Sequence, residues 1–361
     1  MLMTNGGRIM SAAEYRESLR RYRPRVFVDG HRVESVADEP RFEPGIRAVG
    51  VTYDFAQRPE YGGLMLAEQA TSGATVNRML HINRHTDDLL SKLEAVRLLC
   101  RETGCAQRYL THDALNAIYQ STWALDQDAG SGEYHPRFLE YLHLVQREDL
   151  TLGVAMTDAK GDRSQRPHQQ SERNSYVHIK ERRADGIVLS GTKAIVTGGP
   201  YMHELLVMPC RTMTEADKDF AVCCAVPIDA AGLTIVARPA GRPGDEEAKF
   251  SAKYGQSTAV CQFVDVLVPW DRVFMAGEWQ HTEHLVTSYA NHHRHSCIGA
   301  RAGFGDLLIG AGALMSEANG LDMDKVPHLR DAMVDLIKIT ESFFACGVAA
   351  SVYGVTDPCG S

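Results

Sequence analysis

Three short segments of the chain combine side chains that could do chemistry. The first is the loop at 155–163, which offers a threonine hydroxyl, a glycine and charges of both signs. Such a loop could hydrogen-bond the edge of a ring and neutralise a phosphate. It could equally be a turn closed by a local ion pair between Asp162 and Arg163. Spacing alone leaves the two interpretations level.

The second segment lies at 191–200, where Gly198 and Gly199 follow Thr197. Two glycines beside a hydroxyl allow the backbone to approach a flat ligand closely. The plain alternative is a β-turn after a strand. No GxGxxG motif occurs between a strand and a helix, so a doubly wound dinucleotide fold is not supported.

The third segment places three histidines and a cysteine within six residues, at His292, His293, His295 and Cys297. These side chains could ligate a metal, with thiolates added by Cys100 and Cys105. The spacing matches no standard zinc pattern, and on a helix the side chains would point in different directions. A histidine-rich polar site is therefore favoured over a closed metal site.

The elements that must position these segments are predicted in three blocks. Residues 1–150 are expected to form a helical domain. Ser11 and Glu14 fit a capping box, and Thr86 is a candidate N-cap for an apolar helical pattern that Gly104 ends. Residues 151–276 contain short β-branched runs separated by turns, which indicate a sandwich or barrel. Residues 277–361 return to helical spacing, with an apolar stripe from Leu329 to Val348.

This order predicts an α+β protein whose β domain lies between two helical domains. The chain stops soon after an apolar helix, so the last helical bundle is expected to be incomplete. Either a partner supplies the missing layer, or the gene product is shortened.

Composition narrows the function classes. The 361 residues carry 46 acidic and 38 basic side chains, giving a formal charge of -8 and a pI near 6.0. An acidic chain is not expected to bind nucleic acid. No apolar run approaches the roughly 18 residues of a membrane span, and the N-terminus lacks the apolar core of a signal peptide. Nine scattered cysteines predict reduced thiols in the cytoplasm.

The amino-acid sequence of several segments, spread over almost the whole chain, resembles the 4-hydroxyphenylacetate 3-monooxygenase and 4-hydroxybutyryl-CoA dehydratase family. The matching segments are 156–163, 193–198, 203–209, 213–219, 268–274 and 293–306. The resemblance implies a flavoprotein with an acyl-CoA-dehydrogenase-like fold, usually a homotetramer. Overall, the sequence resembles the dehydratase branch of this family more than the hydroxylase branch.

Carrying over the dehydratase residues gives a partial match. Cys105 and His293 match two of its four iron–sulfur ligands, and Gln107 matches an active-site glutamine. Tyr109 and Ala300 stand where the other two ligand cysteines belong. Cys105 and His293 would therefore be metal ligands only if a cluster were present, and a [4Fe-4S] cluster is not expected.

Three further positions compare with the dehydratase active site. Thr197 and Lys253 match it, whereas Cys297 replaces a tyrosine. The hydroxylase pattern is also incomplete: Tyr109 coincides with its tyrosine, but Cys105 stands in place of its arginine and Val154 lies near its histidine. Family members continue with a C-terminal helical stretch that contributes an acid/base residue and flavin contacts, and that this chain lacks.

These matches lead to one principal hypothesis: an FAD-dependent monooxygenase that hydroxylates a phenolic or related small substrate with oxygen and reduced flavin, the latter supplied by a reductase. The residues expected to act on substrate are Tyr109, His293, Gln107 and Lys253. The residues expected to bind flavin are Met156, Thr157, Asp158, Lys160, Gly161, Lys193, Thr197 and Gly198.

Two alternatives remain. One is a 4-hydroxyacyl-CoA dehydratase or isomerase, because moving a double bond by proton transfer could proceed without a cluster. The other is a shortened, non-catalytic member that acts as partner of a full-length subunit. In every case the expected ligands are small molecules, with neither nucleic acid nor membrane as partner.

Overall fold

The computed structural model describes residues 7–105, 107–130 and 132–361. The α-helices are α1 (Ala12–Leu19), α2 (Glu43–Gln57), α3 (Gly62–Met65), α4 (Thr86–Thr103), α5 (Tyr109–Ala129), α6 (Tyr134–Glu148), α7 (Lys249–Lys253), α8 (Thr282–Ala318) and α9 (Pro327–Val352). The strands are β1 (Arg25–Val28), β2 (His31–Val33), β3 (Leu66–Glu68), β4 (Thr75–Asn77), β5 (Leu152–Ala155), β6 (His178–Arg183), β7 (Gly186–Thr197), β8 (Glu204–Val207), β9 (Val222–Pro227), β10 (Leu233–Ala237), β11 (Thr258–Pro269) and β12 (Val273–Ala276).

Local sequence signals explain where the helices begin and end. The capping box at α1 is confirmed: the Glu14 backbone N–H donates to Ser11 Oγ at 3.2 Å, and the Ser11 N–H donates to Glu14 Oε2 at 2.9 Å. Helix α4 ends at Gly104, as predicted, because this residue adopts the left-handed conformation at φ 68°. Its N-cap is His85, one residue before the predicted Thr86.

The β region consists of two main sheets. One has the order β2-β1-β10-β11-β7-β6, and the other has the order β12-β9-β8-β5. Both sheets are open, so the barrel alternative of the sequence prediction is wrong. Strands β1 and β2 come from a part of the chain predicted to be mainly helical, and β1 pairs in parallel with β10. Pairing between residues about 200 positions apart leaves no local signal in the sequence.

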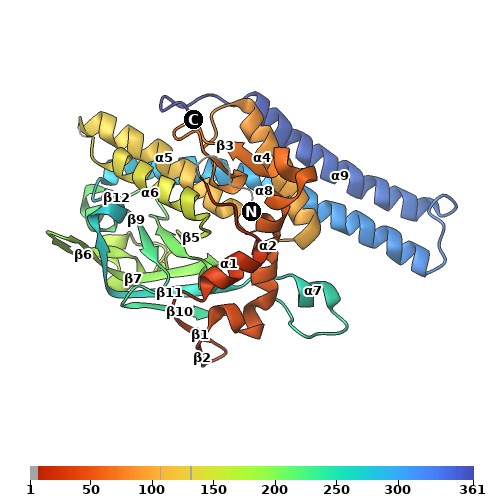
Figure 1. Ribbon diagram of the computed structural model, residues 1–361, viewed down its shortest axis with the longest axis horizontal. Coiled ribbons are helices and arrows are strands. Elements are labelled where there is room, and N and C mark those ends of the chain that lie inside the picture. The colour runs from red at the N-terminus through yellow and green to blue at the C-terminus, as the bar shows by residue number, and fades with distance from the viewer. Residues whose placement is uncertain (1–6, 106, 131) are drawn as a thin grey trace.

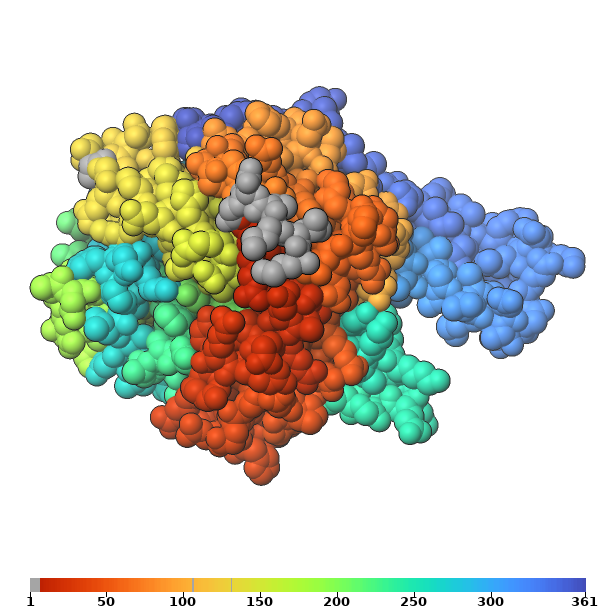
Figure 2. Space-filling model, in the orientation of Figure 1, coloured from red at the N-terminus to blue at the C-terminus, as the bar shows by residue number. Residues whose placement is uncertain are grey.

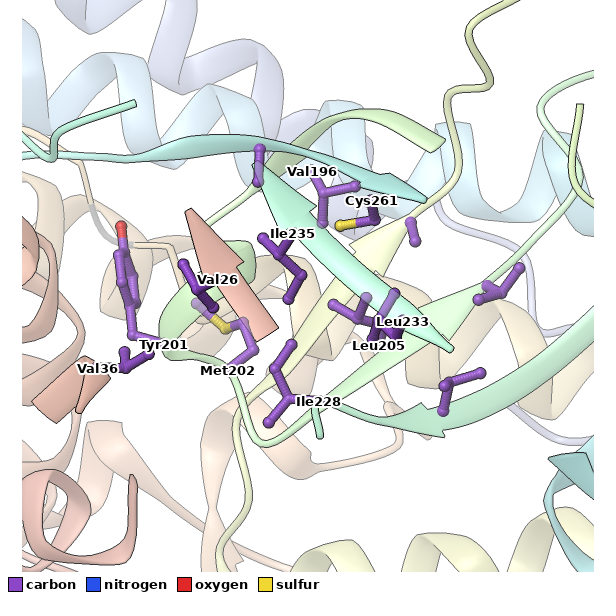
Figure 3. Packing of buried hydrophobic residues seen from close by; sticks show 14 of the residues in the cluster. Val26, Val36, Val196, Tyr201, Met202, Leu205, Ile228, Leu233, Ile235 and Cys261 are labelled. Atoms are coloured by element: carbon purple, nitrogen blue, oxygen red, sulfur yellow. The ribbon is translucent and has the colours of Figure 1, made fainter. Parts of the chain in front are cut away.

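A single hydrophobic cluster joins the two sheets. Figure 3 shows Val26 and Ile235 of the larger sheet, and Val196 and Cys261 of β7 and β11, gathered around Leu205 of the smaller one. All five side chains are buried. This shared core fixes β5 and β7 relative to each other, and the ends of these two strands carry the first two chemical segments.

Helix α8 links the third segment to the rest of the molecule. Its first half packs against α4 and α5, and α9 packs along it (Figure 1). By length and composition alone, the segment Trp279–Ala318 could cross a membrane, with a mean hydropathy of 1.3 over its most apolar window. Only 22% of that window is buried.

The predicted apolar stripe on α9 is confirmed in its second half, where Thr340, Phe344 and Gly347 are buried. Ile337 and Phe343, also part of the predicted stripe, are 40% exposed. Figure 2 shows the far ends of α8 and α9, in blue, projecting from the body as a hairpin.

Candidate active site

The first two chemical segments and α8 enclose a cavity of about 430 Å³. It lies between the ends of β5 and β7, the start of α5, and one face of α8. The lining residues are Cys105, Gln107, Tyr109, Leu110, Val154, Met156, Thr157, Ile195, Thr197, Gln256, Tyr289, His293, Cys297 and Arg301. No carboxylate is among these residues, and His293 and Arg301 are their cationic side chains.

Helix α8 contributes four of these side chains at intervals of four residues: Tyr289, His293, Cys297 and Arg301. This spacing places them on one face of the helix. His292 and His295 point elsewhere: Nε2 of His292 lies 3.3 Å from Gln120 Oε1, and Nε2 of His295 lies 2.8 Å from Ser351 Oγ. The predicted divergence of the histidine cluster is therefore confirmed, and only His293 reaches the cavity.

A buried carboxylate holds His293. Nδ1 of His293 donates to Asp113 Oδ2 at 3.2 Å, and Ser296 Oγ donates to Asp113 Oδ1 at 2.6 Å. Burial lowers the pKa of His293, but its hydrogen bonds to Asp113 and Cys297 outweigh burial and raise the pKa to about 10. Burial raises the pKa of Asp113, yet hydrogen bonds from His112 and His293 hold it well below its usual range. His293 is therefore an imidazolium at neutral pH.

Two tyrosines fix the plane of the His293 ring. Tyr289 stacks on it with ring centroids 5.4 Å apart, and Tyr109 stacks with centroids 6.1 Å apart. Burial raises the pKa of both phenols well above 10. Both tyrosines thus remain protonated, and the hydroxyl of Tyr109 can act as a hydrogen-bond donor.

The two cysteines of the cavity differ in their surroundings. The thiol of Cys105 lies 3.4 Å from the carbonyl oxygens of Thr103 and Gly255, and burial raises its pKa to about 11. The Cys297 sulfur lies 3.5 Å from Nε2 of His293 and belongs to a half-buried side chain. Cys297 is therefore the cavity thiol that lies beside the His293 imidazolium.

Gln107 lies at the cavity wall with both ends of its amide engaged. Its Nε2 donates to the Gly255 carbonyl at 3.1 Å, and its Oε1 accepts from the Tyr201 hydroxyl at 2.8 Å. Lys253, also expected in the site, does not line the cavity. Its side chain is 59% exposed and lies 3.5 Å from Glu102 Oε1.

The residues expected to bind flavin separate into two groups. Met156, Thr157 and Thr197 line the cavity, and Thr197 Oγ1 accepts from Gln256 Nε2 at 3.2 Å. Asp158 and Lys193 instead form a buried ion pair of 2.8 Å, in which Lys193 also donates to the Met156 and Met208 carbonyls. This pair anchors the loop, with its charges directed away from the cavity.

The remaining three residues of that set shape the backbone. Lys160 and Gly161 have positive φ values of 74° and 51°. Gly198 has φ 68°, and a Cβ atom there would lie 2.2 Å from Met202. The ion pair considered between Asp162 and Arg163 is absent from the ion pairs of the described residues; Asp162 accepts instead from Ser164 Oγ at 2.7 Å.

Several site residues were missed from the sequence. Asp113 is the most important: it lies four residues after Tyr109, and the structure places both residues on α5. Ile195 has φ 57° and is 69% exposed, an unusual conformation for a β-branched residue that aims it into the cavity. Lys92 is completely buried, and its amine has no hydrogen-bond partner among the described residues.

Comparisons with known proteins agree over the full length of the chain. Residues 11–275 match the family model of the 4-hydroxyphenylacetate 3-hydroxylase N terminal, and residues 282–361 match that of the C terminal. The chain is 38% identical to the 4-hydroxybutyryl-CoA dehydratase/vinylacetyl-CoA-Δ-isomerase of Clostridium aminobutyricum, covering 98% of this chain and 73% of the relative. It is 26% identical to the 4-hydroxyphenylacetate 3-monooxygenase oxygenase component of Thermus thermophilus, covering 93% and 69%.

Solved structures give the same picture. An archaeal 4-hydroxybutyryl-CoA dehydratase from N. maritimus superposes with a TM-score of 0.93 at 37% identity, covering 98% of this chain and 71% of that one. The butyryl-CoA dehydrogenase of Megasphaera elsdenii shares the fold more distantly, with a TM-score of 0.51 at 15% identity, covering 73% and 63%. The chain belongs to the 4-hydroxyphenylacetate 3-hydroxylase family.

Proposed function

We propose that this protein is a flavin-dependent monooxygenase that hydroxylates a phenolic or related small acid in the cavity described above. The observation that carries the proposal is the pairing of Tyr109 and His293 in a cavity whose wall has no carboxylate. A phenol hydroxyl and a substrate carboxylate both require hydrogen-bond donors and positive charge, and these are the groups that the wall offers.

The residues present fit a flavin. Thr157 and Thr197 offer hydroxyls at the cavity wall, Ile195 presents an apolar surface to a flat ring, and the backbone at Gly198 leaves no room for a side chain. These residues, together with Met156, would hold the ring. Reduced FAD, supplied by a reductase, would provide the electrons that activate oxygen.

The side chains of the cavity would act on the substrate. The imidazolium of His293 would hold the phenol oxygen and stabilise its negative charge as the proton leaves. The Tyr109 hydroxyl would donate a second hydrogen bond. Arg301, which forms no ion pair among the described residues, would bind the acid group of the substrate.

A dehydratase or isomerase acting on a 4-hydroxyacyl-CoA is the second candidate, favoured by the identity of 38% to such an enzyme. The donor set argues against its cluster. Tyr109 and Ala300 offer no thiolate, and among the described residues no three His, Cys, Asp or Glu side chains gather as a metal site. A four-iron cluster needs four ligands of the thiolate or imidazole type.

One experiment separates these candidates. The protein is purified without oxygen, its absorption spectrum and iron content are measured, and it is then given reduced FAD, oxygen and a panel of phenolic acids. A flavin spectrum without iron and oxygen-dependent hydroxylation would support the monooxygenase. Stoichiometric iron, or turnover of a 4-hydroxyacyl-CoA without oxygen, would replace it with the dehydratase. A protein that cannot be loaded with flavin would favour the non-catalytic alternative.

We also propose that the protein works as a homo-oligomer, a tetramer by its resemblance to the family, in the cytoplasm. The hairpin of α8 and α9 exposes large apolar side chains, including Leu314 and Met315, each 67% exposed. Apolar patches of this kind are usually covered by another chain. No disulfide bond is found among the described residues, which suits a reducing compartment.

A further inference from the structure

Three side chains at the cavity stand in the order thiol, imidazole, carboxylate. The Cys297 sulfur lies 3.5 Å from Nε2 of His293, and Nδ1 of the same ring lies 3.2 Å from Asp113 Oδ2. An activated nucleophile in an enzyme has this arrangement: a base within hydrogen-bond reach, itself oriented by a third group. Because an ionised carboxylate only accepts, Nδ1 must carry a proton, and Nε2 is directed to the sulfur.

The arrangement is held rigidly. Asp113 is completely buried and is fixed on its other oxygen by Ser296. The imidazole lies against the rings of Tyr109 and Tyr289, which restrict its rotation. Nε2 of His293 therefore remains directed at Cys297 without a substrate to position it.

Cys297 is also placed where a small molecule can reach it. It lines the same cavity of about 430 Å³ and is half-buried, whereas Cys223, Cys224 and Cys261 are fully enclosed. A neighbouring imidazolium stabilises the thiolate, which is the reactive form of cysteine. Cys105 shares the cavity, but its thiol contacts two backbone carbonyl oxygens and no basic side chain among the described residues.

A cation follows on the same face of α8. Arg301 lies four residues after Cys297 and lines the cavity, and among the described residues its guanidinium has neither an ion pair nor a hydrogen bond. The imidazole of His293, the thiol of Cys297 and the guanidinium of Arg301 thus follow one another along α8 at intervals of four residues. A nucleophile beside a free cation suits an electrophile whose carbonyl oxygen becomes negative during attack.

We propose that Cys297 is a nucleophile that bonds covalently, as the thiolate paired with the His293 imidazolium, to α,β-unsaturated carbonyl compounds entering the cavity, with His293 as proton donor, Asp113 as positioning residue and Arg301 as the cation for the carbonyl oxygen. The sulfur forms a bond with the β-carbon, and the electron pair of the C=C bond moves to the enolate oxygen beside Arg301. The proton that the imidazolium holds on Nε2 then passes to the α-carbon, which leaves His293 neutral. The reaction is an addition, so neither the protein nor the substrate is oxidised and no group leaves.

The test exposes the purified full-length protein to N-ethylmaleimide for increasing times and measures labelling of each cysteine by peptide mass spectrometry. Cys346 is the internal reference, because it is an exposed thiol on α9. We expect Cys297 to be labelled at least tenfold faster than Cys346. Labelling at an equal or lower rate would overturn the proposal. Neither flavin nor turnover is required, so the result is independent of the proposed monooxygenase activity.

Two variants identify the partners of the thiol. In His293→Gln, labelling of Cys297 should fall at least tenfold while that of Cys346 stays the same; an unchanged ratio would overturn the role of His293. Arg301→Gln, at an exposed position, provides a test that does not disturb the buried groups. It should slow N-ethylmaleimide several-fold at Cys297 but leave the rate with iodoacetamide, which forms no enolate, unchanged. Equal effects on both reagents would exclude Arg301 from the reaction.

Discussion

At the scale of single residues, the behaviour of the site depends on one buried charge. Asp113 has no contact with solvent, yet His293 and Ser296 donate hydrogen bonds to it and its pKa is lowered. An anion enclosed in this way stabilises a cation next to it strongly, because little water screens the pair. The buried carboxylate of Asp113, which does not itself line the cavity, therefore keeps His293 protonated.

Replacing Asp113 with asparagine should consequently return His293 towards its ordinary pKa of 6.5 from about 10. We expect a fall of about one unit or more, since an adjacent opposite charge shifts a pKa by about 1–3 units. Titration of the histidine ring signals by NMR measures it. Ser296→Ala is the matched control: it removes one hydrogen bond to Asp113 but keeps the charge, so it should move the pKa less. An unchanged pKa in Asp113→Asn would contradict this account.

At the scale of elements, small residues allow α8 to approach α4 closely. A Cβ atom added at Gly303 would lie 2.3 Å from the Arg97 carbonyl oxygen, and one at Gly299 would lie 2.6 Å from the Leu93 carbonyl oxygen. In both cases the obstacle is backbone, which cannot move aside. This close contact determines how deeply the histidine face of α8 enters the cavity.

Gly303→Ala should therefore push the two helices apart and lower the free energy of unfolding by about 1–3 kcal/mol. Gly310→Ala, in the same helix, meets nothing within 4 Å. It should be neutral or stabilise by up to about 1 kcal/mol, because alanine favours helix over glycine. Denaturant unfolding of both variants gives the comparison, and equal effects would show that helix propensity, and not packing, decides.

At the scale of the whole molecule, the projecting hairpin of α8 and α9 is the feature that a single chain leaves unexplained. Ile339 on α9 is 69% exposed and Met315 on α8 is 67% exposed. Figure 2 shows the blue hairpin formed by these two helices standing clear of the body. Exposure of this much apolar surface favours association through the hydrophobic effect.

We expect the double variant Leu314→Glu and Met315→Glu to reduce the oligomer to smaller species, since both charges would have to be buried in the interface. Light scattering after gel filtration measures the mass. Lys325→Glu, at an 82% exposed side chain in the loop beyond, is the control and should leave the mass unchanged. A wild-type chain that elutes as a monomer at micromolar concentration would refute the proposed oligomer.

The whole molecule should also lose stability in mild acid. Burial lowers the pKa of His112 to about 4 and that of His203 to about 3. Below pH 6.5 these two histidines bind protons in the unfolded chain but stay neutral in the folded protein. The free energy of unfolding therefore falls as the pH drops from 6.5 towards 4. Each such histidine contributes a slope of about 1.4 kcal/mol per pH unit. His293 acts oppositely: its raised pKa adds stability below pH 6.5 that is lost as pH rises through about 10.

Urea unfolding between pH 7 and pH 4.5 tests this expectation. His203→Gln should flatten the slope by about one proton, although it lowers stability at neutral pH because Thr151 loses its hydrogen-bond acceptor. A slope identical to that of the parent protein would show that His203 titrates normally in the folded state.

The sequence by itself determined the local features of this protein. Capping residues and Gly104 set helix ends, β-branched runs located most strands, and the helical pattern predicted that the clustered histidines point in different directions. These features depend on contacts a few residues apart, which spacing encodes. The resemblance to the family likewise followed from short matching sequence segments.

Only the tertiary structure decided how distant segments meet. The pairing of β1 with β10, the burial of Asp158 with Lys193, and the contact of Asp113 with His293 join residues between 35 and 209 positions apart. Lys193 illustrates the difference: its amine contacts Asp158 and the Met156 and Met208 carbonyls, and residue spacing does not indicate these partners. Which polar groups face a cavity depends on how elements close over one another, and residue spacing carries no information about that closure.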